Sequence, residues 1–312
     1  MGWASFLVLV LGLCAAEDFE GSVLLEPEDA INREALFKST IGSWIQNRSV
    51  KIKVGILNVE GRDSTSEFWV EFDPVATSHV SRERIILPYI VNVDEEVKTI
   101  SFHKHKHAGC SSILKPSGSY SQVNQSQYVE NGIQLCERFV SHYSGINDTE
   151  DNSTSESLFY SQWKLWHQPY VMLDAFKTTF SMSSSMCYHC QAEENIEEEM
   201  EFNAISLGKV INWFEKIDFI DIDAQGLDVS LILSLSEAQV SRVGEFKIEC
   251  QGSVDYETGA FAYLYYYGNS SYTFNSCKLA QERLQGQGFE CKYEVNNCGC
   301  AEFNLFCKQV PF

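Results

Sequence analysis

The segment Phe219–Asp228, "FIDIDAQGLD", has two acids where a buried strand would end. Apolar residues alternate with Asp221 and Asp223, and Gln225 and Gly226 then form a turn before a helix-like run. Residues two apart on a strand share a face, so both carboxylates are expected on one side. Buried acids are costly unless they lie near a strand end and have partners. Asp223 either caps the following helix or contributes to a ligand site.

A third acid, Glu26, closes the apolar run "SVLL" directly before a proline. Proline stops strand pairing, and helical spacing follows it. One interpretation is an exposed acid that favours the dipole of that helix. The other is an acid that ends a second parallel strand and accepts hydrogen bonds from both hydroxyls of a ribose. Glu26 and Asp223 would then meet at one rim of a sheet.

The elements that would position these acids alternate along the chain. Strand patterns are interleaved with helical ones, which predicts an α/β open sheet, and two closing strands at 289–295 and 302–310 predict an antiparallel edge. The acidic run 193–201 favours a solvated helix face. The other expected strands are 22–25, 50–57, 66–72, 97–107, 217–223 and 245–250, and the expected helices are 28–37, 205–214, 227–240 and 276–288.

The composition limits the function classes. A formal charge of −20 on 312 residues argues against nucleic-acid partners and against binding to an anionic membrane surface. Ten of the eleven cysteines fall between Cys110 and Cys307, an even number that fits disulfides. Five Asn-X-Ser/Thr sequons add to this, at Asn47, Asn124, Asn147, Asn152 and Asn269. The pattern favours the secretory pathway, with a cytoplasmic location as the alternative.

The segment "FNAISLGKVINWFEKIDFIDIDAQGLDVSLI" resembles the C-terminal half of FkbM-type S-adenosylmethionine-dependent methyltransferases. There a helix beginning "SL" leads into a strand reading "lKIDaQGsD". "VLLEPED" resembles the second strand of that family, and "VGILNVEGRDSTSEFWV" resembles its third strand with the turn and strand that follow. "AGCSSIL" and the closing segments 264–271 and 288–307 resemble later parts of the family's sequence. These similarities keep the family's order from residue 21 to 308, apart from about 115–203.

The resemblance implies a Rossmann-like methyltransferase sheet that binds S-adenosyl-L-methionine and transfers its methyl group to a hydroxyl of a small molecule or glycan. Glu26 would bind the cofactor ribose, and Asn58 and Val59 would flank the adenine. Asp223 and Gln225 would also contact the cofactor.

A hydroxyl acceptor also needs a general base, and Asp223 or Asp221 is the nearest candidate.

Two departures from the family pattern affect this prediction. The lysine that precedes "ID" in the family is Asp221 here, so a positive group has become negative. The glycine-rich loop after the first strand is also missing, which predicts a sheet without its first strand. Gly2 would then be the last glycine of that loop, with 1–16 as the first core helix. In the alternative, the apolar run 3–13 is the core of a signal peptide.

We therefore expect residues 1–312 to form a single methyltransferase-like domain, with 141–203 as a surface insertion. The competing hypothesis is a catalytically inactive, secreted methyltransferase-like glycoprotein that acts as a binding module. The row His103, His105 and His107 has the spacing of metal ligands on one strand face, but a solvated face is the favoured interpretation, so no metal is expected. The sequence makes no prediction of the oligomeric state.

Overall fold

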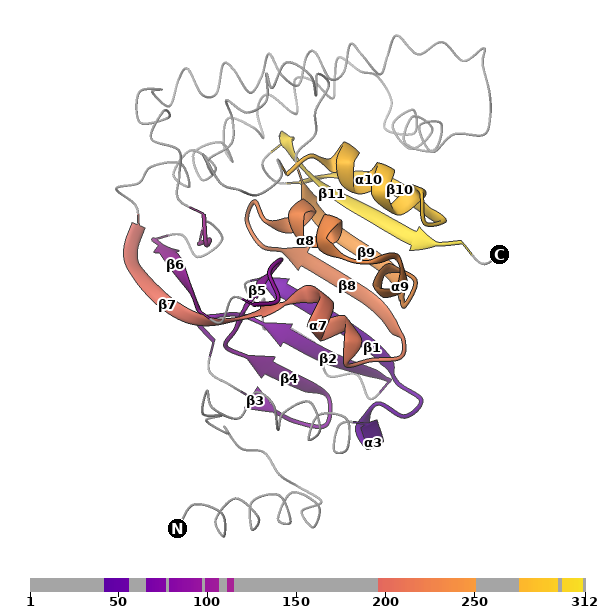
Figure 1. Cartoon of the computed structure of the whole chain (residues 1–312), viewed down its shortest axis with the longest axis horizontal. Coiled ribbons are helices and arrows are strands. Elements are labelled where there is room, and N and C mark those ends of the chain that lie inside the picture. The colour runs from indigo at the N-terminus through magenta and orange to yellow at the C-terminus, as the bar shows by residue number, and fades with distance from the viewer. Residues whose placement is uncertain are drawn as a thin grey trace.

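An eight-stranded β-sheet forms the centre of the chain (Figure 1). The computed structural model describes residues 42–55, 66–76, 79–96, 99–106, 111–114, 196–250, 275–296 and 299–310. In spatial order the strands are β10 (Phe289–Asn296), β11 (Gly299–Gln309), β9 (Val243–Cys250), β8 (Ile217–Asp223), β1 (Ser49–Gly55), β2 (Glu67–Phe72), β4 (Arg84–Leu87) and β3 (His79–Val80).

The five strands β9, β8, β1, β2 and β4 are parallel to one another. β11 runs antiparallel to both β9 and β10, so the chain closes on an antiparallel pair at one edge. The predicted α/β, Rossmann-like sheet with an antiparallel C-terminal strand pair is confirmed. Two disulfides strengthen this edge: Cys250–Cys277 links β9 to a helix, and Cys291–Cys307 links β10 to β11.

The strand order corrects one prediction about this sheet. β1 pairs with β8 on one side and with β2 on the other, so the order β4-β2-β1-β8-β9 corresponds to 3-2-1-4-5 in a doubly wound sheet. Residues 49–55 therefore occupy the central, first-strand position, and they are not the third strand. The expectation that the first strand is missing is wrong, because local patterns do not determine which parallel strands become neighbours.

The two faces of the sheet differ in chemistry. On one face, fully buried apolar side chains such as Ile52, Ile220 and Phe246 pack beneath the described helices. The opposite face of the same strands carries charged residues, because side chains alternate along a strand. The helices are α7 (Leu207–Asn212), α8 (Asp228–Ser234), α9 (Glu237–Val240) and α10 (Cys277–Gln285), with α3 (Gly42–Trp44) before β1, and Figure 1 shows α7 to α10 together on one side.

A second, three-stranded sheet lies beyond the carboxyl ends of the parallel strands. Its order is β5 (Ile90–Asn92), β7 (Ile196–Ser206) and β6 (Thr99–His105). β7 contains most of the acidic run that the sequence predicted as a helix, and that prediction is wrong. Glu198 and Glu199 are register partners of Lys104 and His103 on β6, so pairing with a basic strand overrides the local pattern.

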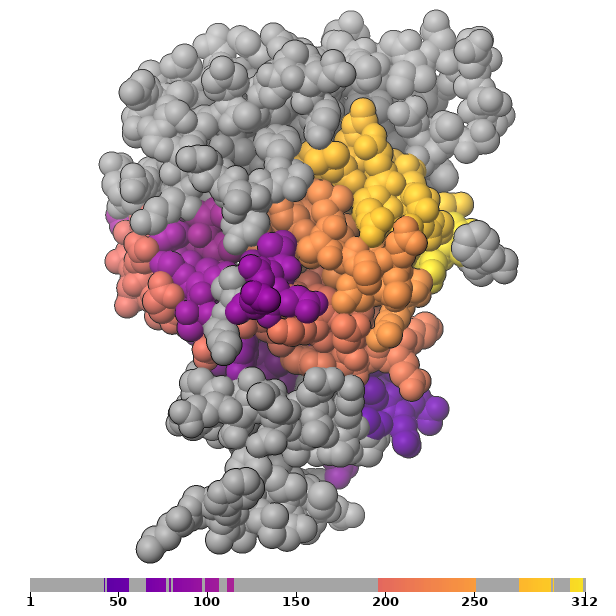
Figure 2. All heavy atoms as spheres, viewed as in Figure 1, coloured from indigo at the N-terminus to yellow at the C-terminus, as the bar shows by residue number. Residues whose placement is uncertain are grey.

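The parts of the chain on either side of residues 115–195 form one surface. On the face drawn in Figure 2, purple atoms from strands before residue 115 lie directly against orange atoms from residues after 196. The pairing of β5 with the end of β7 makes the same connection in the backbone. Residues before 115 and residues after 195 therefore both surround the carboxyl ends of the parallel strands.

Candidate nucleoside site at the carboxyl ends of the strands

The ends of β1 and β8 approach closely at the point where the strand order reverses. Gly55 is the register partner of Asp223, and its φ is +114°. A Cβ at residue 55 would lie 1.9 Å from the carbonyl oxygen of Asp223, so only glycine fits. In open α/β sheets, ligands bind in the crevice outside this reversal point. Gly55 and Asp223 therefore mark the expected ligand rim.

The turn after β8 has an unusual backbone. Gln225 has a φ of 49° and Gly226 a φ of 98°, and positive values at two central positions are typical of a type I′ turn. The buried carboxylate of Asp228 holds this turn by accepting hydrogen bonds from the backbone N–H groups of Ala224 (2.7 Å) and Gly226 (3.0 Å). The turn is thus fixed from inside by the first residue of α8.

Asp228, and not Asp223, accepts the backbone hydrogen bonds of the turn, and the side-chain oxygen of Asn275 accepts from the N–H of Val229 in the first turn of α8. Leu227 is the N-cap of α8 and makes no side-chain cap hydrogen bond. Burial raises the pKa of Asp228 to about 7, and the negative charge of Asp223 adds to this rise. Asp223 remains at the rim, with 36% of its side chain exposed.

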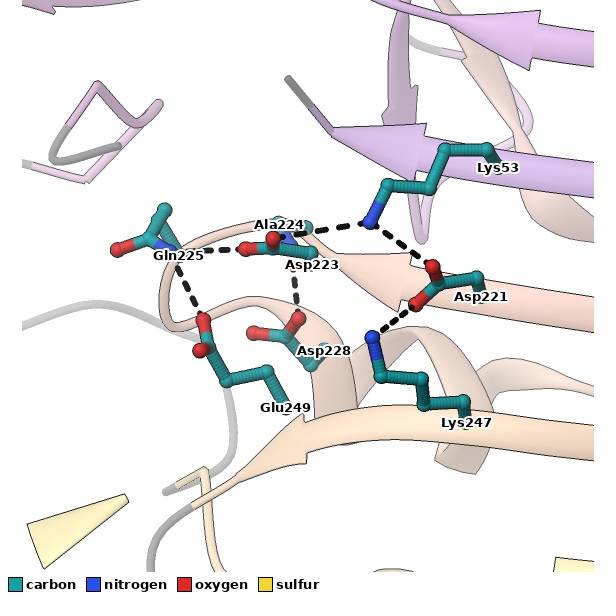
Figure 3. Close-up of polar contacts among 8 residues, drawn as sticks. All are labelled: Lys53, Asp221, Asp223, Ala224, Gln225, Asp228, Lys247 and Glu249. Atoms are coloured by element: carbon teal, nitrogen blue, oxygen red, sulfur yellow. Dashed lines mark hydrogen bonds and ion pairs between the residues drawn. The ribbon is translucent and has the colours of Figure 1, made fainter. Parts of the chain in front are cut away.

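A row of alternating charges crosses four strands below the rim. Glu71, Lys53, Asp221 and Lys247 are successive register partners on β2, β1, β8 and β9. The ammonium of Lys53 lies 3.1 Å from one carboxylate oxygen of Asp221, and that of Lys247 lies 3.3 Å from the other (Figure 3). Opposite charges directly across neighbouring strands attract, so the row accounts for acids in a buried strand.

The charge row also changes the meaning of Asp221. The resemblance led us to expect a lysine at this position, which holds an acid, but Lys53 and Lys247 approach that acid from both neighbouring strands. Burial alone would lower the pKa of Lys53, but the nearby carboxylates of Asp223 and Asp221 outweigh it and raise the pKa. Lys53 therefore stays a cation, and positive charge is kept close to the rim by different strands.

Gln225 connects the rim to β9. Its side-chain amide donates to Asp223 Oδ1 and to Glu249 Oε2, both at 2.8 Å (Figure 3). Its carbonyl oxygen accepts a hydrogen bond from the hydroxyl of Ser112 at 2.9 Å. The predicted site residues Asp221, Asp223 and Gln225 are thus brought together.

A cleft opens at the rim between the two sheets. Aromatic side chains from the end of β2, the β4–β5 connection and β6 contribute to its walls, and the polar groups include Asp223 and two serines. The cavity encloses about 40 Å³, so the described walls hold one edge of a ligand and not a whole nucleoside. These aromatic and polar lining residues are Phe72, Tyr89, Phe102, Ser111, Ser112 and Asp223.

Asp73 is an acid at a strand end that the sequence analysis did not single out. It follows β2 directly, is 5% exposed, and its Oδ1 accepts a hydrogen bond from the N–H of Val75 at 3.0 Å. β2 lies beside β1 in the sheet, so Asp73 is the acid at the end of the strand in the second position. The signal was present in "EFWVEFDP", an alternating strand that ends on Asp-Pro.

Four predicted site residues lie outside the described residues: Gly2, Glu26, Asn58 and Val59. Both edges of each parallel strand are occupied by described strands. The position beside β1 that was expected for a strand ending at Glu26 is therefore taken by β2. Glu26 is therefore not expected beside the end of β1, where the ribose assignment required it.

The histidine row is not the solvated face that the sequence favoured. His103 and His105 are 5% and 3% exposed, and that interpretation is wrong for both residues. The lysine between them, Lys104, is register partner to Glu198 on the other side of the strand. Across the described ranges, no three His, Cys, Asp or Glu residues are grouped so that they could hold a metal ion. His107 lies outside those ranges.

Comparison with protein-family models, curated proteins and solved structures found no match to this chain. None of the helices in the described part is long and apolar enough to cross a membrane. The strand order and the rim geometry are therefore the basis for the proposal that follows.

Proposed function

We propose that the chain is an S-adenosylmethionine-dependent methyltransferase of FkbM type that methylates a hydroxyl of a small molecule or glycan. The observation that carries the proposal is that β1, β2 and β8 end side by side, at Gly55, at Phe72 followed by Asp73, and at Asp223, where the order of a 3-2-1-4-5 sheet reverses. The antiparallel C-terminal strand pair and the "IDAQG" turn at this rim support it further.

The residues around the cleft suit an adenosyl ligand. An acid about 20 residues after the first-strand glycine, at the end of the second strand, is well placed to accept hydrogen bonds from both ribose hydroxyls. Asp73 has this position relative to Gly55. Phe72 and Tyr89 offer an apolar wall for the adenine, which stacks well on aromatic faces. Asp73 takes the ribose role that was expected for Glu26, while Asn58 and Val59 lie outside the described residues and stay predictions for the adenine.

The general base would be Asp223 and not Asp221. Asp221 is held between two lysines and is largely buried, whereas Asp223 lines the cleft and is partly exposed. Lys53 places a positive charge 3.6 Å from this carboxylate. The cofactor would supply an electrophilic methyl group. Asp223 would orient the acceptor hydroxyl and take up its proton as the oxygen forms the new bond, so that catalysis depends mainly on positioning.

The compartment we propose is the secretory pathway. The disulfides Cys250–Cys277 and Cys291–Cys307 join cysteines that are all at most 5% exposed. Disulfides persist in oxidising compartments and are rare in the cytosol. The acceptor would then be an exported molecule or a glycan of that compartment.

A second candidate function is a binding module without catalysis. The enclosure of Asp221 by two lysines favours it, because it removes one of the two candidate bases. Such a module would hold a ligand at the same rim with no transfer step. The methyltransferase would transfer methyl groups and the binding module would not, while both predict ligand binding at Asp73.

Isothermal titration calorimetry with S-adenosylmethionine tests the proposal. Asp73→Asn should weaken binding at least about tenfold, because a charged acceptor of two hydroxyls is lost. Asp94→Asn is the matched control. Asp94 Oδ1 accepts from the N–H of Glu96 two residues on, as Asp73 Oδ1 does from that of Val75, but Asp94 follows β5 of the three-stranded sheet and not a strand of the parallel sheet. Absence of binding by the wild-type chain would refute the cofactor, and equal affinities would remove Asp73 from the site.

A further inference from the structure

The disulfide Cys250–Cys277 joins two segments that both contact the turn 224–228. Cys250 ends β9 directly after Glu249, and Cys277 begins α10 two residues after Asn275. Both cysteines are at most 1% exposed. The covalent link therefore lies within the core and not at the surface.

Asn275 is the first of these contacts. Its side-chain oxygen accepts a hydrogen bond from the N–H of Val229 at 2.8 Å. Its amide nitrogen donates to Asp228 Oδ2 at 3.2 Å and to the carbonyl oxygen of Glu249 at 3.3 Å. Asn275 is 6% exposed, so these three contacts are made away from water. One side chain thus joins α8, the carboxylate that holds the turn, and the end of β9.

Glu249 is the second contact, through its carboxylate. It accepts from the amide of Gln225, whose left-handed backbone is unfavourable for a residue with a Cβ. The same amide also donates to Asp223 Oδ1. The conformation of Gln225 and the direction of the Asp223 carboxylate are therefore linked to the position of β9's last residues.

We propose that Asn275 and Glu249, joined through the Cys250–Cys277 disulfide, form a clamp that positions the turn 224–228 and the Asp223 carboxylate. Both are positioning residues, because they act through Asp228 and Gln225 and not on the ligand. The part of this inference that concerns cofactor affinity rests on the proposed function. The part that concerns the turn does not.

The second disulfide provides a matched control. Cys291 and Cys307 are direct register partners on β10 and β11, and the residues of the turn are not among their strand neighbours. The two bridges close loops of similar length, with sequence separations of 27 and 16, so their removal should have similar global effects. A change confined to the Cys250–Cys277 variant therefore reports the clamp.

The experiment measures amide hydrogen exchange at Ala224, Gly226 and Val229 in the whole chain under native conditions. In Cys250→Ala/Cys277→Ala, all three amides should exchange at least about tenfold faster than in wild type. In Cys291→Ala/Cys307→Ala, they should keep the wild-type rates. Calorimetry with S-adenosylmethionine should show a loss of affinity of about tenfold for the first variant only.

Asn275→Asp tests the clamp without touching a cysteine. The aspartate keeps an oxygen for the N–H of Val229 but replaces the amide that donates to Asp228 and to the Glu249 carbonyl by a second acceptor oxygen. Exchange at Ala224 and Gly226 should rise, while that at Val229 stays near wild type. A general loss of stability would speed exchange at all three amides, so it would not produce this difference between them.

The outcomes separate the clamp from the proposed function. Faster exchange at the turn with no cofactor binding by any variant supports the clamp and refutes the function. Equal exchange rates and equal affinities in all variants overturn the clamp and leave the function standing. If Cys250→Ala/Cys277→Ala does not fold, Asn275→Asp alone tests the clamp. Equal changes in the exchange rates of Ala224, Gly226 and Val229 in that variant would contradict it.

Discussion

The ammonium of Lys53 lies 3.1 Å from the carboxylate of Asp221, and the two residues are register partners on adjacent parallel strands. Lys247 approaches the other oxygen of the same carboxylate from the opposite neighbour, β9. An acid in a buried strand is thus neutralised from both sides. Although residue 221 is an acid, the rim keeps its positive charge, because Lys53 and Lys247 on the neighbouring strands provide two ammonium groups.

Asp221→Asn should lower the free energy of unfolding by about 3 kcal/mol, since it leaves a buried lysine with part of its compensation lost. Adding Lys53→Met should recover part of that loss, because an apolar side chain costs less to bury than an unpaired ammonium. Urea denaturation of the two variants and wild type measures both effects.

The control for this cycle is Glu245→Gln, which breaks an exposed ion pair with Lys308 on the same sheet. Exposed pairs contribute about 1 kcal/mol or less, so this variant should stay near wild type. An Asp221 variant no less stable than the control would show that the buried row does not hold the strands together.

Gly55→Ala should be strongly destabilising, whereas Gly42→Ala should be close to neutral. The added Cβ at residue 55 would overlap the backbone of β8, and a positive φ by itself costs about 1–2 kcal/mol for a residue with a side chain. A Cβ added at Gly42 would meet nothing within 4 Å. Thermal unfolding of the two variants compares the positions directly, and equal melting temperatures would contradict the close approach of β1 and β8.

Stability should depend on pH through Asp228. Its pKa is raised to about 7 in the folded chain, so the folded state holds a proton that the unfolded state releases near the ordinary value of 3.8. The contribution of Asp228 to the free energy of unfolding is therefore fully present below about pH 4. It is lost as the pH rises to about 7, at a rate of at most about 1.4 kcal/mol per pH unit.

The measurement is the free energy of unfolding of wild type and Asp228→Asn across that window. The asparagine cannot ionise, so the wild-type advantage should shrink as the pH rises. Charges elsewhere titrate in both proteins and cancel in the difference. Parallel curves would mean that Asp228 is ionised throughout, held so by the N–H groups of Ala224, Gly226 and Asn275.

Asn47 should carry an N-linked glycan when the chain is expressed through a secretory pathway. It lies in an exposed turn with a φ of 64°, directly before β1 and hence at the amino end of the parallel strands. β1 is seven residues long, which separates this end from the rim by about 20 Å. Glycosidase treatment should reduce the mass of wild type by one glycan more than that of Asn47→Gln. An identical mass shift for both would rule out modification at this residue.

Elements with a clear local pattern could be predicted from the sequence. The alternation in "IDFIDID" ends at Asp223, and β8 ends at the same residue. The periodic apolar run after Gly226 predicted the helical region that contains α8 and α9. In these segments local propensity and tertiary packing agree, as expected for strongly periodic elements.

The site could be predicted only in part, because its geometry depends on which strands pair. Residues 50–57 were assigned to the third strand, and this moved the expected ribose acid to Glu26 and away from Asp73. The lysine partners of Asp221 were equally hidden, since Lys53 and Lys247 reach it through registers with β1 and β9. A parallel register joins residues far apart in sequence, and no local pattern specifies it.

The most direct test of the central claim is a titration of isotope-labelled protein with S-adenosylmethionine, followed through backbone amide chemical shifts. A cofactor at the carboxyl ends of the strands should give saturable shifts at Gly55, Asp73 and Ala224, and little change at the amino ends, at Ser49 and Ile217. Absence of saturable shifts at the carboxyl ends, or shifts at the amino ends alone, would contradict it.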